Sequence, residues 1–198
     1  MAQTIGKRPA KHRASAPATK GSQRSEAYVF PSDLGWIAVC WTGQALEGFT
    51  LGHPSAQAAA AATSAICAIS SNPPEFVLRL AERIQSYAAG TDDDFSDVPL
   101  DLSHLTEFQR RVVKECRRIR VGQTLSYADL AAKAGSPGAA RAVGNTMARN
   151  RFPIVVPCHR VIGSAGSLGG FSAPSGISLK RRMLDLEAAS RKRKTRPR

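Results

Sequence analysis

The spacing of hydrophobic residues along this chain changes from a strand-like pattern to a helical one, and this change restricts the fold more than any other feature. Between residues 27 and 52, three short runs rich in β-branched and aromatic side chains are separated by turn residues, as is typical of strands. Over 54–69, 73–89 and 106–119 the pattern favours helices. We therefore expect an α+β fold, with a small strand-and-helix domain followed by a mostly helical one.

Composition divides the chain into four segments. Residues 1–26 are rich in Lys, Arg, Ala, Ser and Pro and predict a disordered basic arm, while 190–198 hold six bases and no acid and predict a disordered basic tail. Between them we expect an N-terminal α/β domain over 27–104, which ends in an acidic linker with a short strand, and a C-terminal domain over 105–189. The arm lacks the apolar face of an organelle transit peptide, so tethering to DNA is the preferred interpretation.

The net charge of +13 is unevenly distributed. Residues 26–104 contain two bases and ten acids, whereas 105–189 contain fourteen bases and five acids, a difference of +9. A basic C-terminal half with basic ends is typical of a protein that binds phosphates of nucleic acid, although such ends can also serve solubility alone. No apolar run reaches the length of about 18 residues that a membrane span needs, so we expect no membrane partner.

The four cysteines lie far apart and form no CxxC pair, so a disulfide framework is not expected. Cys40 and Cys67 could be combined with His53 and His104 into a zinc site, but their spacing fits no compact ligand pattern. We expect both cysteines to be small buried side chains instead, and no metal.

Two short helices are predicted at 127–134 and 138–149, separated by Gly135-Ser136-Pro137. Such a pair has the form of a helix-turn-helix, and it is also common in helical domains that bind no DNA. Small residues surround Arg141 on the second helix, namely Ala139, Ala140, Ala142 and Gly144. A face of this kind can approach a nucleic-acid groove closely or pack against another helix.

The run Ile154 to Gly163 contains the candidate nucleophile. Ile154, Val155 and Val156 predict a short buried strand that ends at Pro157, which places Cys158 and His159 where the chain leaves the core. A thiol attacks as the thiolate, and a nearby histidine oriented by a carboxylate can take its proton. The alternative is a structural cysteine beside a surface histidine.

The segment PCHRV, together with SYADLA, RAVGNTMARN and a C-terminal helix that includes Glu187, resembles the O6-alkylguanine-DNA alkyltransferases. The resemblance is dense over 106–187 and looser over 27–102. It implies a ribonuclease-H-like N-terminal domain, a helix-turn-helix in the C-terminal one, and a monomer that uses no cofactor. It also implies that an alkyl group moves irreversibly from O6-alkylguanine in double-stranded DNA to the protein itself, once per molecule, after the base is flipped out. The place of action would be the cytoplasm, with the nucleoid, or the nucleus in a eukaryote.

The resemblance also implies a chemical role for five residues. Cys158 would accept the alkyl group, and His159 would act as its base through a water molecule. Glu187 would orient His159 and balance its charge. Tyr127 would donate a proton to the leaving guanine and crowd the phosphate, and Asn150 would brace the turn before the cysteine.

Other positions would contact DNA or the flipped base. Arg141 would fill the gap that the base leaves, with Gly144 on the same close-approaching face. Met147 and Phe171 would wall the pocket, and Ser172 with the carbonyls of Cys158 and Val161 would bind the polar edge of guanine. Phe171 stands where many relatives have Tyr, and the loop 172–178 is about two residues longer than usual.

Three other functions compete with this interpretation. The first is a non-catalytic protein of the same fold that marks alkylated bases, although such relatives lack the acceptor cysteine. The second is a hydrolase that uses Cys158, His159 and Glu187, and the third is a transcription regulator. The hydrolase leaves the DNA-facing features unexplained, and no dimer interface or effector domain is visible for a regulator.

Overall fold

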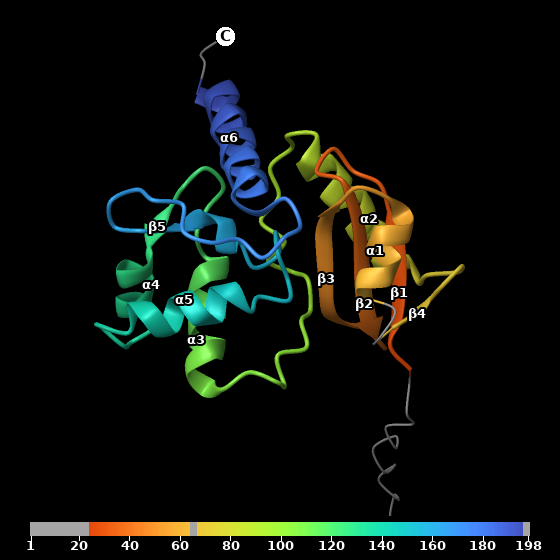
Figure 1. The fold of residues 1–198 in the computed structure, drawn as a ribbon, viewed down its shortest axis with the longest axis horizontal. Coiled ribbons are helices and arrows are strands. Elements are labelled where there is room, and N and C mark those ends of the chain that lie inside the picture. The colour runs from red at the N-terminus through yellow and green to blue at the C-terminus, as the bar shows by residue number, and fades with distance from the viewer. Residues whose placement is uncertain (1–23, 64–66, 196–198) are drawn as a thin grey trace, which may run out of the picture.

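The computed structural model describes residues 24–63 and 67–195, and its N-terminal part is built on a four-stranded sheet (Figure 1). The strands are β1 (Glu26–Phe30), β2 (Trp36–Thr42), β3 (Ala45–His53) and β4 (Ala68–Ile69). Their order across the sheet is β3-β2-β1-β4, with the first three antiparallel and β4 parallel to β1. The three predicted strands are therefore confirmed. The predicted arm lies almost wholly outside the described residues.

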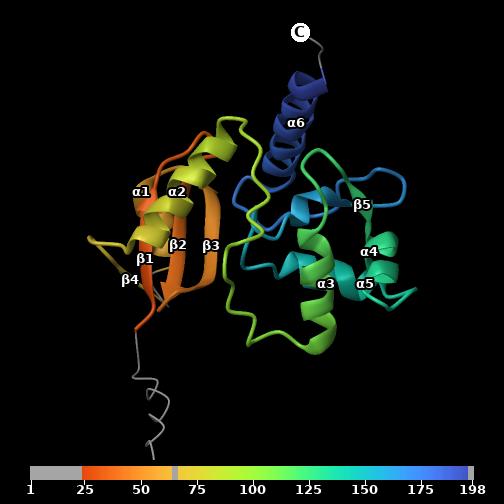
Figure 2. The ribbon, with the colours of Figure 1, turned by 180° about the vertical axis from the view of Figure 1, so that it is seen from behind.

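Helices cover the two faces of this sheet: α1 (Ala56–Thr63) lies on one face and α2 (Glu75–Ala88) on the other, as the two opposite views show (Figures 1 and 2). Strand β2 is consequently buried without interruption from Ile37 to Trp41. On one side Cys40 packs with Cys67 and Ala27 in a small buried cluster, so the prediction of buried cysteines is confirmed.

The helix predicted over 54–69 is wrong at its C-terminal end. Helix α1 ends at Thr63, and Ala68–Ile69 form β4. The backbone N–H groups of Ala68 and Ser70 donate to the carbonyls of Ser25 and Ala27, so pairing with the open edge of β1 replaces the last helical turn.

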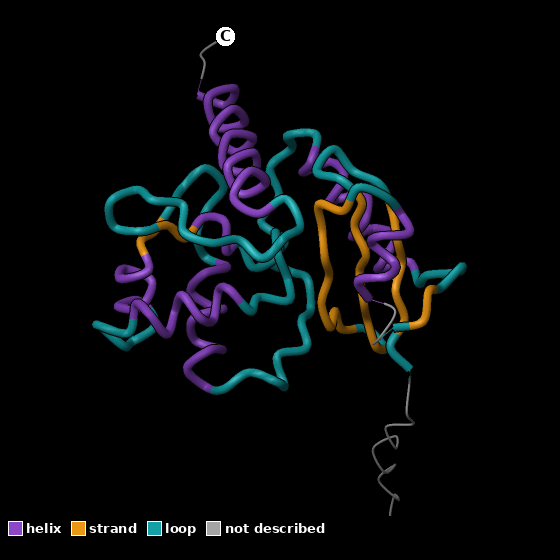
Figure 3. Tube along the Cα trace, in the orientation of Figure 1, coloured by secondary structure: helices purple, strands orange, loops and turns teal. Residues whose placement is uncertain are grey.

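The C-terminal half consists of helices around a small two-stranded sheet (Figures 1 and 3). Its elements are α3 (Glu107–Arg117), β5 (Leu125–Ser126), α4 (Tyr127–Lys133), α5 (Ala140–Ala148), the 3₁₀ turn η1 (Cys158–Arg160), β6 (Val161–Ile162) and α6 (Gly176–Thr195). Thr106 caps α3 as predicted, with Gln109 completing a capping box. Strands β5 and β6 are parallel neighbours.

One hydrophobic core runs through both halves, from β2 and α2 to α3, α4 and the segment before Cys158. Helix α6 adds to this connection, because the Ser190 hydroxyl donates to Asp92 and Arg193 donates to the Gly90 carbonyl at 2.8 Å. The expectation of a disordered tail from residue 190 is therefore wrong as far as Thr195. None of the helices in the described ranges is long and apolar enough to cross a membrane.

Candidate active site

The segment before Cys158 is a tight buried turn, and the prediction of a strand over 154–156 is wrong. Ile154 adopts a left-handed conformation with φ of 71°, which is rare for a β-branched residue. Asn150 holds the turn from both sides: its Nδ2 donates to the Val156 carbonyl at 2.8 Å, and its Oδ1 accepts from the Phe152 N–H at 3.0 Å. Side-chain hydrogen bonds thus take the place of a strand ladder.

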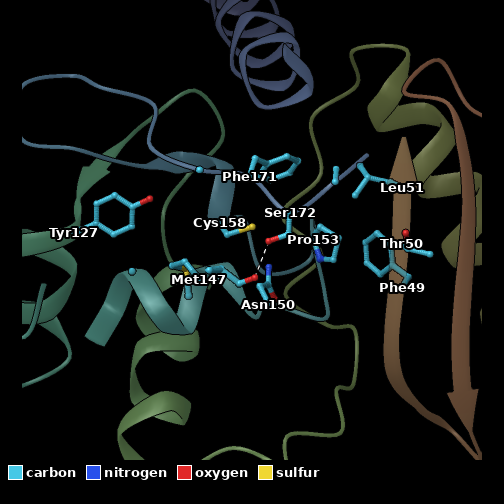
Figure 4. A pocket seen from close by; sticks show the side chains of 14 residues that line it. Phe49, Thr50, Leu51, Tyr127, Met147, Asn150, Pro153, Cys158, Phe171 and Ser172 are labelled. Carbon is cyan, nitrogen blue, oxygen red and sulfur yellow. Dashed lines mark hydrogen bonds between the residues drawn. The ribbon is translucent and has the colours of Figure 1, made fainter. Parts of the chain in front are cut away.

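Cys158 is the first residue of η1 and lies at a cavity of about 520 Å³ (Figure 4). The cavity brings together seven of the predicted site residues: Cys158, Tyr127, Asn150, Met147, Gly144, Phe171 and Ser172. Its remaining lining is Phe49, Thr50, Leu51, Ala148, Pro153, Gly170 and Ala173. The three residues of β3 form the wall opposite Tyr127, so the N-terminal half also contributes to the cavity.

His159 and Glu187 form a buried pair that does not line the cavity, with 0% and 1% of their surfaces exposed. His159 Nε2 is 2.8 Å from Glu187 Oε1. A carboxylate accepts hydrogen bonds, so this contact places the imidazole proton on Nε2 and leaves Nδ1 able to accept one. Among the described residues, His159 Nδ1 is the buried side-chain atom without a hydrogen-bond partner. The alternative of a surface histidine is therefore wrong, and Glu187 is as deeply buried as His159.

Glu187 is held as an anion by several donors. Arg160 donates from Nε to Oε2 at 3.0 Å and from Nη2 to Oε1 at 2.8 Å, the Gly122 N–H donates to Oε2 at 2.9 Å, and the Tyr87 hydroxyl donates to Oε1 at 2.7 Å. Burial by itself raises the pKa of Glu187, but the hydrogen bonds and charges of His159 and Arg160 outweigh it and lower the pKa.

The resting site is neutral at Cys158 and at His159. Burial raises the pKa of the Cys158 thiol, against the lowering effects of hydrogen bonding to Asn150 and of the Lys180 charge. Burial lowers the pKa of His159, and the neighbouring Arg160 and Lys180 charges act in the same direction, against Glu187. A neutral thiol beside a neutral imidazole is the arrangement that a base-assisted attack requires.

Tyr127 is positioned by the start of α4. Ser126 caps this helix through a capping box with Asp129, and β5, which ends at Ser126, pairs with β6 just after η1. The Tyr127 hydroxyl is on the side of the ring that faces Cys158 (Figure 4). Burial and the nearby Cys158 raise the pKa of Tyr127, so its hydroxyl keeps its proton and can donate it.

Two of the residues predicted to contact DNA or the base, Arg141 and Val161, do not line the cavity. Arg141 is exposed on α5 and does not line the cavity. Val161 is buried, and its carbonyl accepts from Lys180 Nζ at 2.7 Å. Ser172 lines the cavity, but its hydroxyl donates to the Ala148 carbonyl at 2.7 Å, as the dashed line in Figure 4 shows. The oxygen atom of this hydroxyl can still accept a hydrogen bond.

Among the residues at or around the site that sequence reasoning missed are Arg160, Tyr87, Lys180 and Phe49. Arg160 is beside the predicted pair in sequence, and the rule that a buried charge needs a partner could have linked it to Glu187. Tyr87 is one of six buried residues of α2, the others being Val77, Leu80, Ala81, Ile84 and Ala88. The residues next to Tyr87 and Phe49 in sequence give no sign of a role at the site, because the groups that both side chains approach lie far along the chain.

Comparison of this chain with known protein families and solved structures agrees with this geometry. Residues 107–189 match the model of the 6-O-methylguanine DNA methyltransferase DNA-binding domain. Proteins named methylated-DNA–protein-cysteine methyltransferase from Methanothermobacter thermautotrophicus and Mycobacterium tuberculosis are 41% and 47% identical over 120 and 106 residues, which are 61% and 54% of this chain. The matches span 66% and 62% of those relatives, about two thirds of their length.

A solved structure of Mycobacterium tuberculosis OGT in complex with DNA is similar over both halves of the chain. It superposes with a TM-score of 0.68 at 32% identity and covers 83% of this chain and 94% of that one. Identity and coverage of this size extend the relationship beyond the DNA-binding domain. The chain belongs to the methylated-DNA–protein-cysteine methyltransferase family.

Proposed function

We propose that this protein repairs DNA by moving an alkyl group from O6-alkylguanine to its own Cys158, once per molecule. The observation that supports this most is the combination of the Cys158 thiol at a 520 Å³ cavity with a buried neutral His159 whose Nδ1 is free to accept a proton. The family to which the chain belongs is named for the same reaction.

The chemistry balances without a cofactor. Cys158 Sγ attacks the alkyl carbon, so that a carbon–sulfur bond forms and the bond to guanine O6 breaks. His159 accepts the thiol proton, through a water molecule where the two side chains do not meet, and Glu187 and Arg160 stabilise the charged ring. Tyr127 donates a proton to the leaving guanine, which gains one proton as the thiol loses one. The thioether product is not hydrolysed under mild conditions, so turnover stops.

Binding to DNA is assigned to α4 and α5 as a helix-turn-helix. The relative that was solved with DNA and the net basic charge of 105–189 support this assignment. Arg141, exposed on α5, is proposed to occupy the space of the flipped base, at a flipping cost of a few kcal/mol. Met147 and Phe171 would contact the base, while Ser172 and the Val161 carbonyl would accept hydrogen bonds from its polar edge.

The finer architectural assignments belong to the same proposal. The sheet order β3-β2-β1-β4, with β4 parallel to β1, supports a ribonuclease-H-like N-terminal domain over 27–104, followed by the alkyl-acceptor domain over 105–189. We assign the working form as a monomer, active where the DNA is: in the cytoplasm at the nucleoid, or in the nucleus of a eukaryote.

The test is to mix the protein with a duplex that carries one O6-methylguanine and to measure the mass of its peptides. One methyl group on the Cys158 peptide, stoichiometric and without turnover, is the expected result. Cys158→Ala should keep its DNA affinity and lose transfer, whereas Cys116→Ala, which changes another buried thiol, should still take up one methyl group. Tight binding with the methyl retained on DNA would support the non-catalytic alternative instead.

A further inference from the structure

Tyr87 connects the N-terminal half of the molecule to the proposed catalytic pair. It is in the last turn of α2 and is 1% exposed, and its hydroxyl reaches the His159–Glu187 pair from the side of the sheet domain. The hydroxyl donates to Glu187 Oε1 at 2.7 Å and is 3.3 Å from His159 Nε2. These three groups therefore meet within one buried cluster.

The direction of the hydrogen bond follows from the charges. Burial, and then the charge and hydrogen bonding of Glu187, raise the pKa of Tyr87 well above 10, so the phenol keeps its proton and can only donate to the carboxylate. Its ring is held at the same time by an edge-to-face contact with Phe95, with 5.9 Å between ring centroids. The hydroxyl thus has a fixed place.

We propose that Tyr87 is a positioning residue that sets the basicity of His159 through Glu187, an inference that rests on the proposed alkyl transfer. Glu187 Oε1 accepts from Tyr87, from His159 and from Arg160. Each donor withdraws charge from the carboxylate. A less negative Glu187 stabilises the protonated imidazole of His159 less, and the pKa of His159 is lower as a result. Tyr87 thereby keeps the imidazole neutral and ready to accept the proton of Cys158.

Tyr87→Phe tests this, because it removes the hydroxyl and retains the ring. Without that donor the Glu187 carboxylate binds the imidazolium more strongly, so the pKa of His159 should rise, by about half a unit or more. The rate of methyl transfer in a single turnover should then fall about threefold at pH values below the pKa of His159 and recover at high pH. DNA affinity should not change.

Two measurements separate this inference from the proposed function. The pKa of His159 is followed by NMR of its ring nitrogens in the protein without DNA, and the transfer rate is followed against pH. A wild type that transfers nothing would refute the proposed function, and the NMR titration would still decide the role of Tyr87. An unchanged His159 pKa in Tyr87→Phe would overturn the inference.

The matched controls distinguish a positioning role from a packing role. Tyr28→Phe removes a hydroxyl from β1, where the ring stacks on Phe30, and should leave the pKa of His159 and the pH profile unchanged. In a Glu187→Gln background, Tyr87→Phe should have little further effect on His159, since the carboxylate that couples them is gone. Equal shifts with and without the carboxylate would contradict the proposal.

The wild-type protein offers a check that requires no variant. A phenol proton in a buried hydrogen bond exchanges slowly with water, so the Tyr87 hydroxyl should give a resolved proton resonance with a cross-peak to its own ring. Absence of that resonance under conditions in which buried backbone amides remain protected would overturn the inference.

Discussion

Arg160 binds both carboxylate oxygens of Glu187, and the pair is almost completely buried, with 2% and 1% of the two side chains exposed. A third nitrogen of the same guanidinium, Nη1, donates to the Ile119 carbonyl at 2.6 Å. The arginine that follows the proposed base in sequence therefore connects η1, α6 and the turn that follows α3. It also balances the negative charge of the Glu187 carboxylate, which orients His159.

Removal of this arginine should destabilise the fold. Arg160→Met leaves Glu187 buried without its main counter-charge, and breaking a buried pair of this kind costs about 3 to 5 kcal/mol in the free energy of unfolding. Arg111→Met breaks the exposed pair with Glu107 and should cost less than about 1 kcal/mol. Urea denaturation of both variants checks this, and similar losses would mean that the buried pair adds nothing of its own.

The loop over Tyr127 should be sensitive to a single methyl group. A Cβ at Gly169 would lie 2.9 Å from the Tyr127 hydroxyl, whereas a Cβ at Gly166 would have no described atom within 4 Å. Both glycines have positive φ, 64° and 77°, so alanine adds a backbone cost of about 1 kcal/mol at each site.

Gly169→Ala should consequently slow alkyl transfer several-fold more than Gly166→Ala, because it displaces the proton donor. Single-turnover rates on a methylated duplex, with DNA affinity measured in parallel, make the comparison. Equal rates for the two variants would show that the contact with Tyr127 has no part in catalysis.

Arg141→Ala should impair repair of duplex DNA more than reaction with the free alkylated base. The free base needs no flipping, so a side chain that only holds the duplex open has nothing to contribute there. Arg79→Ala, on α2 in the acidic half, serves as the control and should change neither rate. An equal loss on duplex and free base would rule out the base-flipping role.

Acid should destabilise the protein in two steps. His159 has a pKa below its ordinary 6.5 in the fold, so folding favours its neutral form. The contribution of His159 to the free energy of unfolding is complete above pH 6.5 and is lost as the pH falls from that value through the lowered pKa of the folded state. The pKa of Glu187 lies below 4.5, so its contribution is present above pH 4.5 and is lost as the pH falls through the folded pKa.

Unfolding free energies measured in urea at several pH values between 5 and 8 should therefore rise with pH in the wild type. In His159→Gln the rise should be smaller. His104→Gln, which changes an exposed histidine, should alter the slope less. A slope that is unaffected by His159→Gln would mean that this residue does not titrate differently on folding.

Local patterns predicted most of the elements, and tertiary contacts explain the errors. The three long strands and the capping of α3 depend on nearby residues, and both were predicted correctly. The end of α1, the turn around Ile154 and the extension of α6 to Thr195 depend on contacts with distant backbone: the edge of β1, the Asn150 side chain and the Gly90 carbonyl. Helical periodicity carries no information about such partners.

The same distinction applies to the site. The resemblance carried by PCHR and its flanking motifs implied roles for Cys158, His159 and Glu187, and the structure brings Tyr127, Asn150, Met147 and Phe171 to the cavity of Cys158. Tyr87 is 100 positions from Glu187 in the chain, and on an amphipathic helix its ring is like any other buried aromatic. Only the fold reveals that its hydroxyl has an anion to bind.

The position of Glu187 on α6 has a consequence for the newly made chain. Ribosomal synthesis delivers Tyr87 first, Cys158 next and Glu187 after both, so the thiol emerges before the carboxylate that orients its base. A nascent chain therefore carries Cys158 without an assembled proton acceptor. For a protein proposed to react only once, the reactive site is therefore complete only after α6 has been made.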